Sequence, residues 1–396
     1  MKLIRNLLLT LFILFSALGE LSAQNRKNAA TIPAANLTHK YIRFLKQKNV
    51  AMVVNQTSTI QNKHIVDSLR SLGINIKTIF CPEHGFRGNI DAGEHVNTSI
   101  DSATKIPLIS LYGKHKKPDA LDLKDIDIVV FDIQDVGVRF YTYISTLHYV
   151  MEACAENNIE LLVLDRPNPN GYYIDGPILQ TTNQSFVGLH PVPIVYGMTI
   201  GEYAKMINGE EWLANKVKCR LHVIRNAEYN HQKKYTLPIK PSPNLVDQDA
   251  ITLYPSLCLF EGTVISVGRG TYEPFKMIGH PSLSDKYTFS FTPESINGMS
   301  KEPPYLNKQC FGLDLRSYVN DSTQSLNQLN LTWLIEMYNN YADKEHFFNS
   351  FFEKLVGNNE LRTQIISGKS ESEIRSTWQA DLNNFQKIRK KYLLYP

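Results

Sequence analysis

Carboxylates are the residues of this sequence whose surroundings best suit chemistry. Glu83 lies between Pro82 and the pair His84-Gly85, directly after an apolar run. Proline stiffens the backbone before the acid and glycine permits a tight turn after it. A carboxyl group held in this way suits a general acid, which must stay within hydrogen-bond reach of its target. Glu83 could instead cap the next segment through backbone N–H groups. We include His84 among the candidate catalytic residues.

Other acids could supply a second carboxylate. Glu94 and Asp91 lie shortly after Glu83, and Asp132 and Asp165 follow other apolar runs. Hydrolysis of a glycosidic bond usually needs one carboxylic acid for the leaving oxygen and a second carboxylate as base or nucleophile. Glu94 and Asp132 are the candidates for that second role. Asp132 could equally be a helix cap or a residue that ties down a loop.

Two arginines could hold an anionic ligand. Arg139 lies in a segment that also contains Phe140, Tyr141 and Tyr143. A guanidinium group there could clamp a carboxylate while the aromatic rings pack against a sugar. A salt bridge to Asp135 would explain Arg139 equally well. Arg166, next to Asp165, could likewise bind an anionic ligand or form a salt bridge.

Several motifs are missing from the sequence. It has no dinucleotide-binding GxGxxG after the first strand, no phosphate-binding GxxxxGK[ST], no GxSxG and no HExxH. The five cysteines are far apart and form no CxxC pair. Some of them could pair in an exported protein, but Cys154 and Cys258 lie in apolar runs, so buried reduced thiols are favoured. His84, His95 and Asp135 could ligate a metal, but their spacing fits no standard site. We therefore predict no metal site, with metal catalysis as the alternative.

The candidate residues follow the ends of predicted strands. Apolar runs that alternate with helical patterns predict strands at 49–55, 74–80, 107–112, 126–131 and 160–164. Continuous apolar strands separated by helices indicate an α/β fold with a parallel sheet covered on both faces. Ligands bind beyond the carboxyl ends of such strands, where Asn55, Glu83, Tyr112, Asp132 and Asp165 would lie.

The chain length predicts two domains after an export signal. Residues 1–23 combine Lys2 and Arg5 with a short apolar stretch and Ala23 at the cut, which is typical of a cleaved signal peptide. An uncleaved anchor is the alternative, and no later segment is apolar enough to span a membrane. We predict an exported protein, periplasmic or secreted, with an N-terminal sheet domain at 24–180 and a mixed α/β domain at 181–396. A boundary near 285 is the alternative.

The remaining observations bear on partners and on local elements. Net charge is +4, and no basic stripe is present, so no nucleic-acid partner is predicted. A helix is expected at Thr199–Asn208, where Thr199 and Glu202 form a capping-box pattern, and a strand at 219–225. From about residue 325 the chain is predicted to be mainly helical.

Several long strings resemble the exo-β-N-acetylmuramidase family of glycoside hydrolases. They are Cys81–Gly88 with Ala92–Glu94, Ser110–Lys114, Phe131–Tyr143, Leu164–Pro169, Pro241–Asn244, Leu259–Thr263 and Ser266–Thr271. The resemblance covers about residues 40–395 and implies a Rossmann-like lobe, a smaller C-terminal lobe and a site in the cleft between them. It further implies release of terminal N-acetylmuramic acid from the non-reducing end of peptidoglycan-derived saccharides, without a cofactor. Glu83 would be the principal acid, and the second partner stays unassigned.

This substrate gives the polar residues a role. N-acetylmuramic acid carries a lactyl carboxylate that an arginine could bind and an acetamido group that amides could bind. The expected binding residues are Asn55, Gln56, Arg87, Tyr112, Gln134, Asp135, Arg139, Tyr143, Asp165, Arg166, Asn168 and Arg269. Two alternatives remain open: a non-catalytic receptor for muropeptides and a metal-dependent hydrolase of cell-wall amides.

Overall fold

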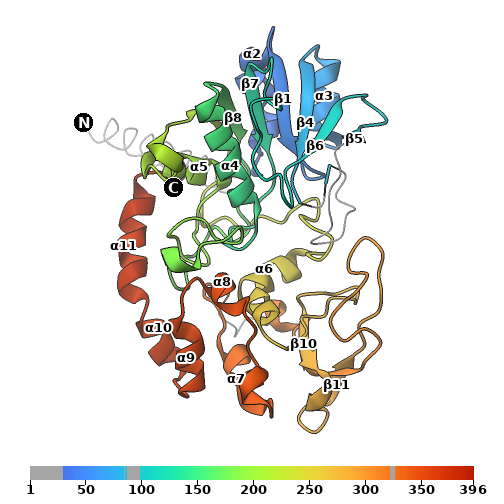
Figure 1. Ribbon diagram of the computed structural model, residues 1–396, viewed down its shortest axis with the longest axis vertical. Coiled ribbons are helices and arrows are strands. Elements are labelled where there is room, and N and C mark those ends of the chain that lie inside the picture. The colour runs from blue at the N-terminus through green and yellow to red at the C-terminus, as the bar shows by residue number, and fades with distance from the viewer. Residues whose placement is uncertain (1–29, 84, 87–98, 322–325) are drawn as a thin grey trace, which may run out of the picture.

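A seven-stranded sheet forms the upper lobe of the molecule (Figure 1). The computed structural model describes residues 30–83, 85–86, 99–321 and 326–396. The strand order is β5-β6-β4-β1-β7-β8-β9, and every neighbouring pair is parallel except β5 and β6. The strands are β1 (Asn49–Val54), β4 (Asn75–Cys81), β5 (Ser99–Ile100), β6 (Pro107–Ser110), β7 (Ile128–Asp132), β8 (Glu160–Leu164) and β9 (Arg220–Ile224).

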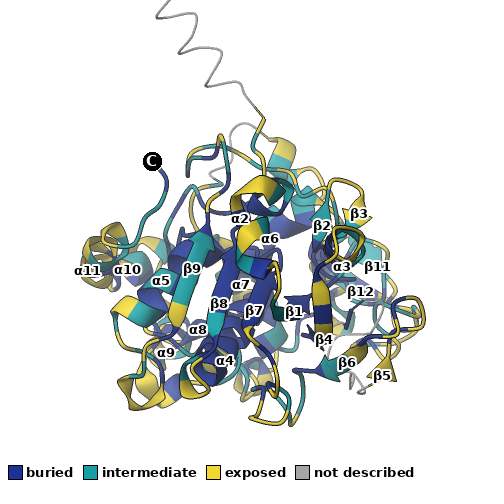
Figure 2. Ribbon diagram, turned by 90° about the horizontal axis from the view of Figure 1, so that it is seen from above, coloured by how far each residue is buried: buried dark blue, intermediate teal, exposed yellow. Residues whose placement is uncertain are grey.

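Helices cover both faces of this sheet, as the apolar strands predicted. Ala51 and Val53 of β1 belong to one hydrophobic core, whereas Val50, Met52 and Val54 belong to another on the opposite face. Seen from above, β1, β7 and β8 are buried along most of their length (Figure 2). The helices of this lobe are α2 (Thr38–Leu45), α3 (Ile65–Ser71), α4 (Tyr143–Glu156) and α5 (Ile200–Gly209), and a short hairpin is formed by β2 (Thr59–Ile60) and β3 (Lys63–His64).

The sheet lobe continues past residue 180. β9 pairs with β8 over five positions, and α5 packs in the same core as α4. The expected cap of α5 is present, because the Thr199 side chain accepts from the Glu202 amide and the Glu202 side chain accepts from the Thr199 amide. The predicted strand at 219–225 and helix at 199–208 are therefore confirmed.

The lower lobe is smaller and mixed (Figure 1). It contains a three-stranded antiparallel sheet of order β10-β12-β11 and several short helices. Its elements are α6 (Gln248–Leu257), β10 (Met277–His280), β11 (Phe289–Phe291), β12 (Cys310–Asp314), α7 (Thr332–Asn340), α8 (Phe352–Val356), α9 (Glu360–Ile366), α10 (Glu371–Ser376) and α11 (Gln379–Lys390). The predicted fold class, a parallel-sheet lobe with a smaller mixed lobe, is confirmed.

The C-terminal segment ties the two lobes together. α11 runs along the side of the molecule back toward α5 (Figure 1). Beyond it, the Leu394 amide donates to Glu202 Oε1 at 2.7 Å, and the Tyr395 hydroxyl donates to Asp165 Oδ2 at 2.5 Å.

All five cysteines are buried and unpaired, as expected. Within the described ranges, no helix combines the length and apolar character needed to cross a bilayer.

Candidate functional site

A pocket of about 220 Å³ lies where the two lobes meet, beyond the carboxyl ends of β4 and β6. The upper lobe contributes Glu83, Tyr112 and the segment that leads into α4. Residues from several segments complete the lining: Phe140, Tyr141, Thr142, Tyr143, Phe186, Val187, Ser242, Asn244, Leu245, Tyr254, Cys258, Glu261, Arg269, Phe275, Phe351 and Leu355. The expected position of a site beyond the strand ends therefore holds for Glu83 and Tyr112.

Glu83 is held in the turn that follows β4. The Gly85 amide donates to the Pro82 carbonyl at 3.0 Å, and Gly85 has a φ of +73°, which suits glycine. The Thr142 hydroxyl donates to Glu83 Oε2 at 3.0 Å. Tyr112 also hydrogen-bonds Glu83; burial, and then the charge of Glu83, raise the pKa of the tyrosine hydroxyl. The turn and two hydroxyl groups thus fix the direction of this carboxyl.

Two buried tyrosines extend the polar wall beside Glu83. Asn55 Nδ2 donates to the Tyr143 hydroxyl at 2.9 Å, and the Tyr141 hydroxyl donates to the Pro241 carbonyl at 2.9 Å. The two rings pack edge to face with centroids 4.8 Å apart. Burial raises the pKa of the Tyr143 hydroxyl, with Glu83 as the next cause, so this group stays protonated at ordinary pH.

A second carboxylate faces the pocket from the lower lobe. Glu261 Oε1 lies 2.5 Å from Arg269 Nε, and the Arg269 guanidinium lies 5.2 Å from the centre of the Phe275 ring. The Cys258 thiol donates to the other Glu261 oxygen at 3.6 Å. Arg269 was expected at the site, whereas Glu261 was not. The signal for Glu261 was its place in the Leu259–Thr263 string, which carried the resemblance but assigned no role to the acid.

Asp132 and Arg166 lie outside the pocket and neutralise each other. Arg166 Nε and Nη2 donate to the two Asp132 carboxylate oxygens at 2.6 and 2.9 Å. Asp132 is completely buried and Arg166 is 5% exposed. β7 and β8 are neighbours, so the side chains at and after their carboxyl ends meet. Neither residue lines the pocket, and their pairing matches the alternatives that the sequence left open, an acid that ties down a loop for Asp132 and a salt bridge for Arg166.

Arg139 is bonded to backbone carbonyls and is not the partner of Asp135. Its guanidinium donates to four backbone carbonyls, those of Pro177, Val192, Leu355 and Val356. The side chain is completely buried. The expected salt bridge to Asp135 is therefore wrong, because backbone oxygens from both lobes are the partners of the guanidinium, and Arg139 does not line the pocket.

Asp135 and Asp165 are also buried structural groups. Asp135 accepts from the Tyr196 hydroxyl and, at 2.7 Å, from the Gly137 amide. Burial raises the pKa of the Asp135 carboxyl to about 6 and that of Asp165 to about 7. Neither residue lines the pocket. Asp135 binds neighbouring loops of the sheet lobe, and Asp165 binds the start of α5 and the C-terminal segment.

The predicted amides mainly hold loops in place. Gln134 donates to the carbonyls of Asp135 and Pro167, Gln56 donates to Pro241, and Asn168 donates to Met198. Asn55 reaches the pocket only through Tyr143. Three further predicted residues, His84, Arg87 and Glu94, lie outside the described residues.

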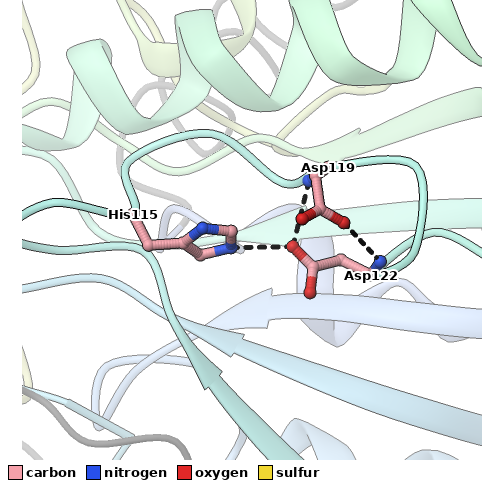
Figure 3. Close-up of side chains that lie close together, drawn as sticks. All are labelled: His115, Asp119 and Asp122. Atoms are coloured by element: carbon pink, nitrogen blue, oxygen red, sulfur yellow. Dashed lines mark hydrogen bonds and ion pairs between the residues drawn. The ribbon is translucent and has the colours of Figure 1, made fainter.

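A His–Asp–Asp group is the one cluster in the described part of the chain with metal-ligand spacing. His115, Asp119 and Asp122 lie on one loop (Figure 3). His115 Nε2 lies 2.7 Å from Asp122 Oδ2, which also accepts from the Asp119 amide at 3.0 Å. Asp119 Oδ1 accepts from the Asp122 amide at 2.9 Å. These bonds account for the closeness of the three side chains without an ion.

Comparisons with known proteins find the same family along most of the chain. Two family models match, described as the N-terminal and C-terminal parts of exo-beta-N-acetylmuramidase NamZ, over residues 50–249 and 252–395. A curated relative from Bacillus subtilis, peptidoglycan beta-N-acetylmuramidase NamZ, is 38% identical over 90% of this chain and 89% of its own.

Two crystal structures of DUF1343 family proteins from Bacteroides fragilis have the same fold. One has a TM-score of 0.85 and 46% identity, over 93% of this chain and 99% of its own. The other has a TM-score of 0.78 and 28% identity, over 92% of this chain and 99% of its own.

Proposed function

We propose that this chain, which belongs to the exo-β-N-acetylmuramidase NamZ family, hydrolyses the glycosidic bond of terminal β-linked N-acetylmuramic acid in peptidoglycan fragments. It is accordingly a glycosidase that acts on peptidoglycan, as the relative from Bacillus subtilis is described to be. The observation that carries the mechanism is the meeting of Glu83 and Glu261 in one pocket between the lobes.

Glu83 is the proposed general acid. Its carboxyl is held in the pocket by hydrogen bonds with Thr142 and Tyr112. Protonation of the leaving oxygen lets the bond break while positive charge develops on the sugar ring, and the reaction is completed when water adds to the anomeric carbon and gives its proton to a carboxylate. Glu261 faces the same pocket, and its negative charge stabilises that developing charge. Glu94 stays a candidate for the second carboxylate and lies outside the described residues.

The rest of the pocket fits an acidic N-acetyl sugar. Arg269 is the guanidinium in the lining, and it is proposed to bind the lactyl carboxylate while it stays paired with Glu261. Tyr141, Tyr254 and Phe186 offer ring surface for the apolar face of the sugar. Export through the signal-like segment at residues 1–23 would bring the enzyme to its substrate outside the cytoplasm, and periplasmic or secreted localisation is part of this proposal.

A release assay with Glu83→Gln tests the proposal. The mature chain is incubated with a synthetic N-acetylmuramic acid β-glycoside and with the N-acetylglucosamine analogue, each with and without EDTA. We expect cleavage of the muramic substrate alone, unchanged by EDTA, and a loss of about 10²–10⁴-fold in kcat for the variant. Glu228→Gln, an exposed acid outside the pocket, is the matched control.

Three outcomes would contradict the proposal. Full activity of Glu83→Gln would remove Glu83 from the mechanism. Binding of both sugars without cleavage would favour a muropeptide receptor. Loss of activity with EDTA would favour a metal-dependent hydrolase.

A further inference from the structure

A second cavity lies on the far side of the loop that borders the Glu83 pocket. Its volume is about 500 Å³, and it shares no lining residue with the first pocket. Ile178 and Leu179 line the second cavity, whereas Phe186 and Val187 of the same loop line the first. The opposite wall consists of residues from α9 and α11 and the segment between α10 and α11. A volume of this size is within the range of about 300–1,000 Å³ that small-molecule sites have.

Two tryptophans with fixed side chains are among the residues that line this cavity. Trp212 lines it, and one face of its indole stacks on His190 with centroids 4.8 Å apart and planes 20° apart. Trp378 is only 3% exposed, and its indole N–H donates to Asp175 Oδ1 at 3.3 Å. Both rings are thus held before any ligand arrives. The partly exposed Trp212 ring supplies rigid aromatic surface, which binds the apolar faces of flat or ring-shaped ligands at low entropic cost, whereas Trp378 is almost wholly buried.

The polar residues of the lining are suited to hydrogen bonding, because two of the three carboxylates already have hydrogen-bond partners within the protein. Glu210 already accepts from the Tyr392 hydroxyl at 2.6 Å and from Lys391 Nζ at 3.1 Å. Glu360 Oε1 accepts from Gln180 Nε2 at 2.9 Å. Free capacity remains on amides, which donate and accept at once. The lining amides are Gln180, Asn358, Gln364 and Asn384.

The charge of the lining selects against an anionic ligand. Glu210, Glu360 and Asp381 are the ionisable residues among the described residues that line it, and no lysine or arginine is among them. A carboxylate such as that of N-acetylmuramic acid would therefore meet like charge without a partner. A neutral ligand with several hydroxyl groups matches aromatic rings, amides and partly satisfied carboxylates better.

We propose that this second cavity is a binding site for a neutral saccharide, with an N-acetylglucosamine-type sugar as the ligand class. The neutral sugar chemistry follows from the lining, and the choice of an N-acetylhexosamine among neutral sugars rests on the proposed function. This site would bind the saccharide without hydrolysing it. It lies next to the Glu83 pocket, which is proposed to bind the acidic sugar.

Neighbouring asparagines on α11 provide a matched pair of variants. Asn383 and Asn384 are both exposed, but only Asn384 lines the cavity. Asn384→Trp places a large side chain in the cavity, whereas Asn383→Trp places the same side chain outside it. The probe is N,N′-diacetylchitobiose, titrated by calorimetry into the mature chain. N-acetylmuramic acid and cadaverine are the anionic and cationic comparisons.

We expect the wild type and Asn383→Trp to bind chitobiose alike and Asn384→Trp to bind it at least about tenfold more weakly. Hydrolysis of a small muramic β-glycoside should stay equal in all three proteins, which separates this site from the Glu83 pocket. If the wild type did not hydrolyse the muramic β-glycoside, the proposed function would be wrong. The chitobiose titration would still test the second site independently. The saccharide proposal is overturned by absence of chitobiose binding, by equal binding in Asn384→Trp, by equal loss in Asn383→Trp, or by cadaverine binding in preference to the sugar.

Discussion

Replacement of Arg139 should destabilise the contact between the two lobes. This guanidinium bonds carbonyls at Pro177 and Val192 on one side and at Leu355 and Val356 at the end of α8 on the other. Arg139→Met keeps much of the volume but removes every donor. We therefore expect a large loss of stability from a residue that does not line the pocket.

The size of the loss follows from the partners that remain. The Val192 carbonyl still accepts from the Leu179 amide at 3.1 Å, so it keeps one donor. The other three carbonyls lose the guanidinium, and each unsatisfied buried acceptor costs about 1–3 kcal/mol. Removal of a buried charge returns part of this cost. The net destabilisation should be about 3 kcal/mol or more.

Urea unfolding followed by tryptophan fluorescence measures this effect. Arg70→Met, at an exposed position in the last turn of α3, is the control and should change stability by less than about 0.5 kcal/mol. Gly357→Ala perturbs the same contact independently, because its Cβ would lie 2.4 Å from Arg139 Nη2 at a φ of +85°. A loss below about 1 kcal/mol for Arg139→Met would refute the reasoning.

Three further predictions concern the site and the sheet lobe. Thr142→Val removes the donor to Glu83 and should lower kcat about fivefold, the equivalent of one hydrogen bond, with KM nearly unchanged in steady-state assays; an unchanged kcat would contradict it. Asp132→Asn leaves the buried Arg166 without its carboxylate and should lower the free energy of unfolding by about 3–5 kcal/mol. A nearly unchanged midpoint of urea unfolding would contradict a stabilising role of this ion pair. The folded pKa of Asp165 is raised to about 7 by burial, so its stabilising contribution is complete near pH 4 and lost as pH rises to 7. The stability of Asp165→Asn relative to wild type should therefore increase over that range in urea titrations, and a constant difference would contradict the shift.

The local sequence was sufficient for the elements of the sheet lobe. β1, β4, β7 and β8 lie where apolar runs predicted strands, and α5 lies where the capping-box pattern predicted a helix. The reason is that burial of both faces demands continuous apolar strands, and a short chain segment already displays that pattern. The placement of Glu83 after a strand, between a proline and a glycine, was visible in the same way.

Only the tertiary structure decided how the charged groups are used. Arg139 and Arg166 looked alike as binders of an anion, yet one bonds four carbonyls and the other bonds Asp132. Glu261 joined Glu83 because the lower lobe folds against the ends of β4 and β6. A charged side chain takes the partner that lies nearest in space, and that partner is set by packing between segments far apart in sequence. Strand and helix patterns record which residues are buried, but they do not record which buried groups meet.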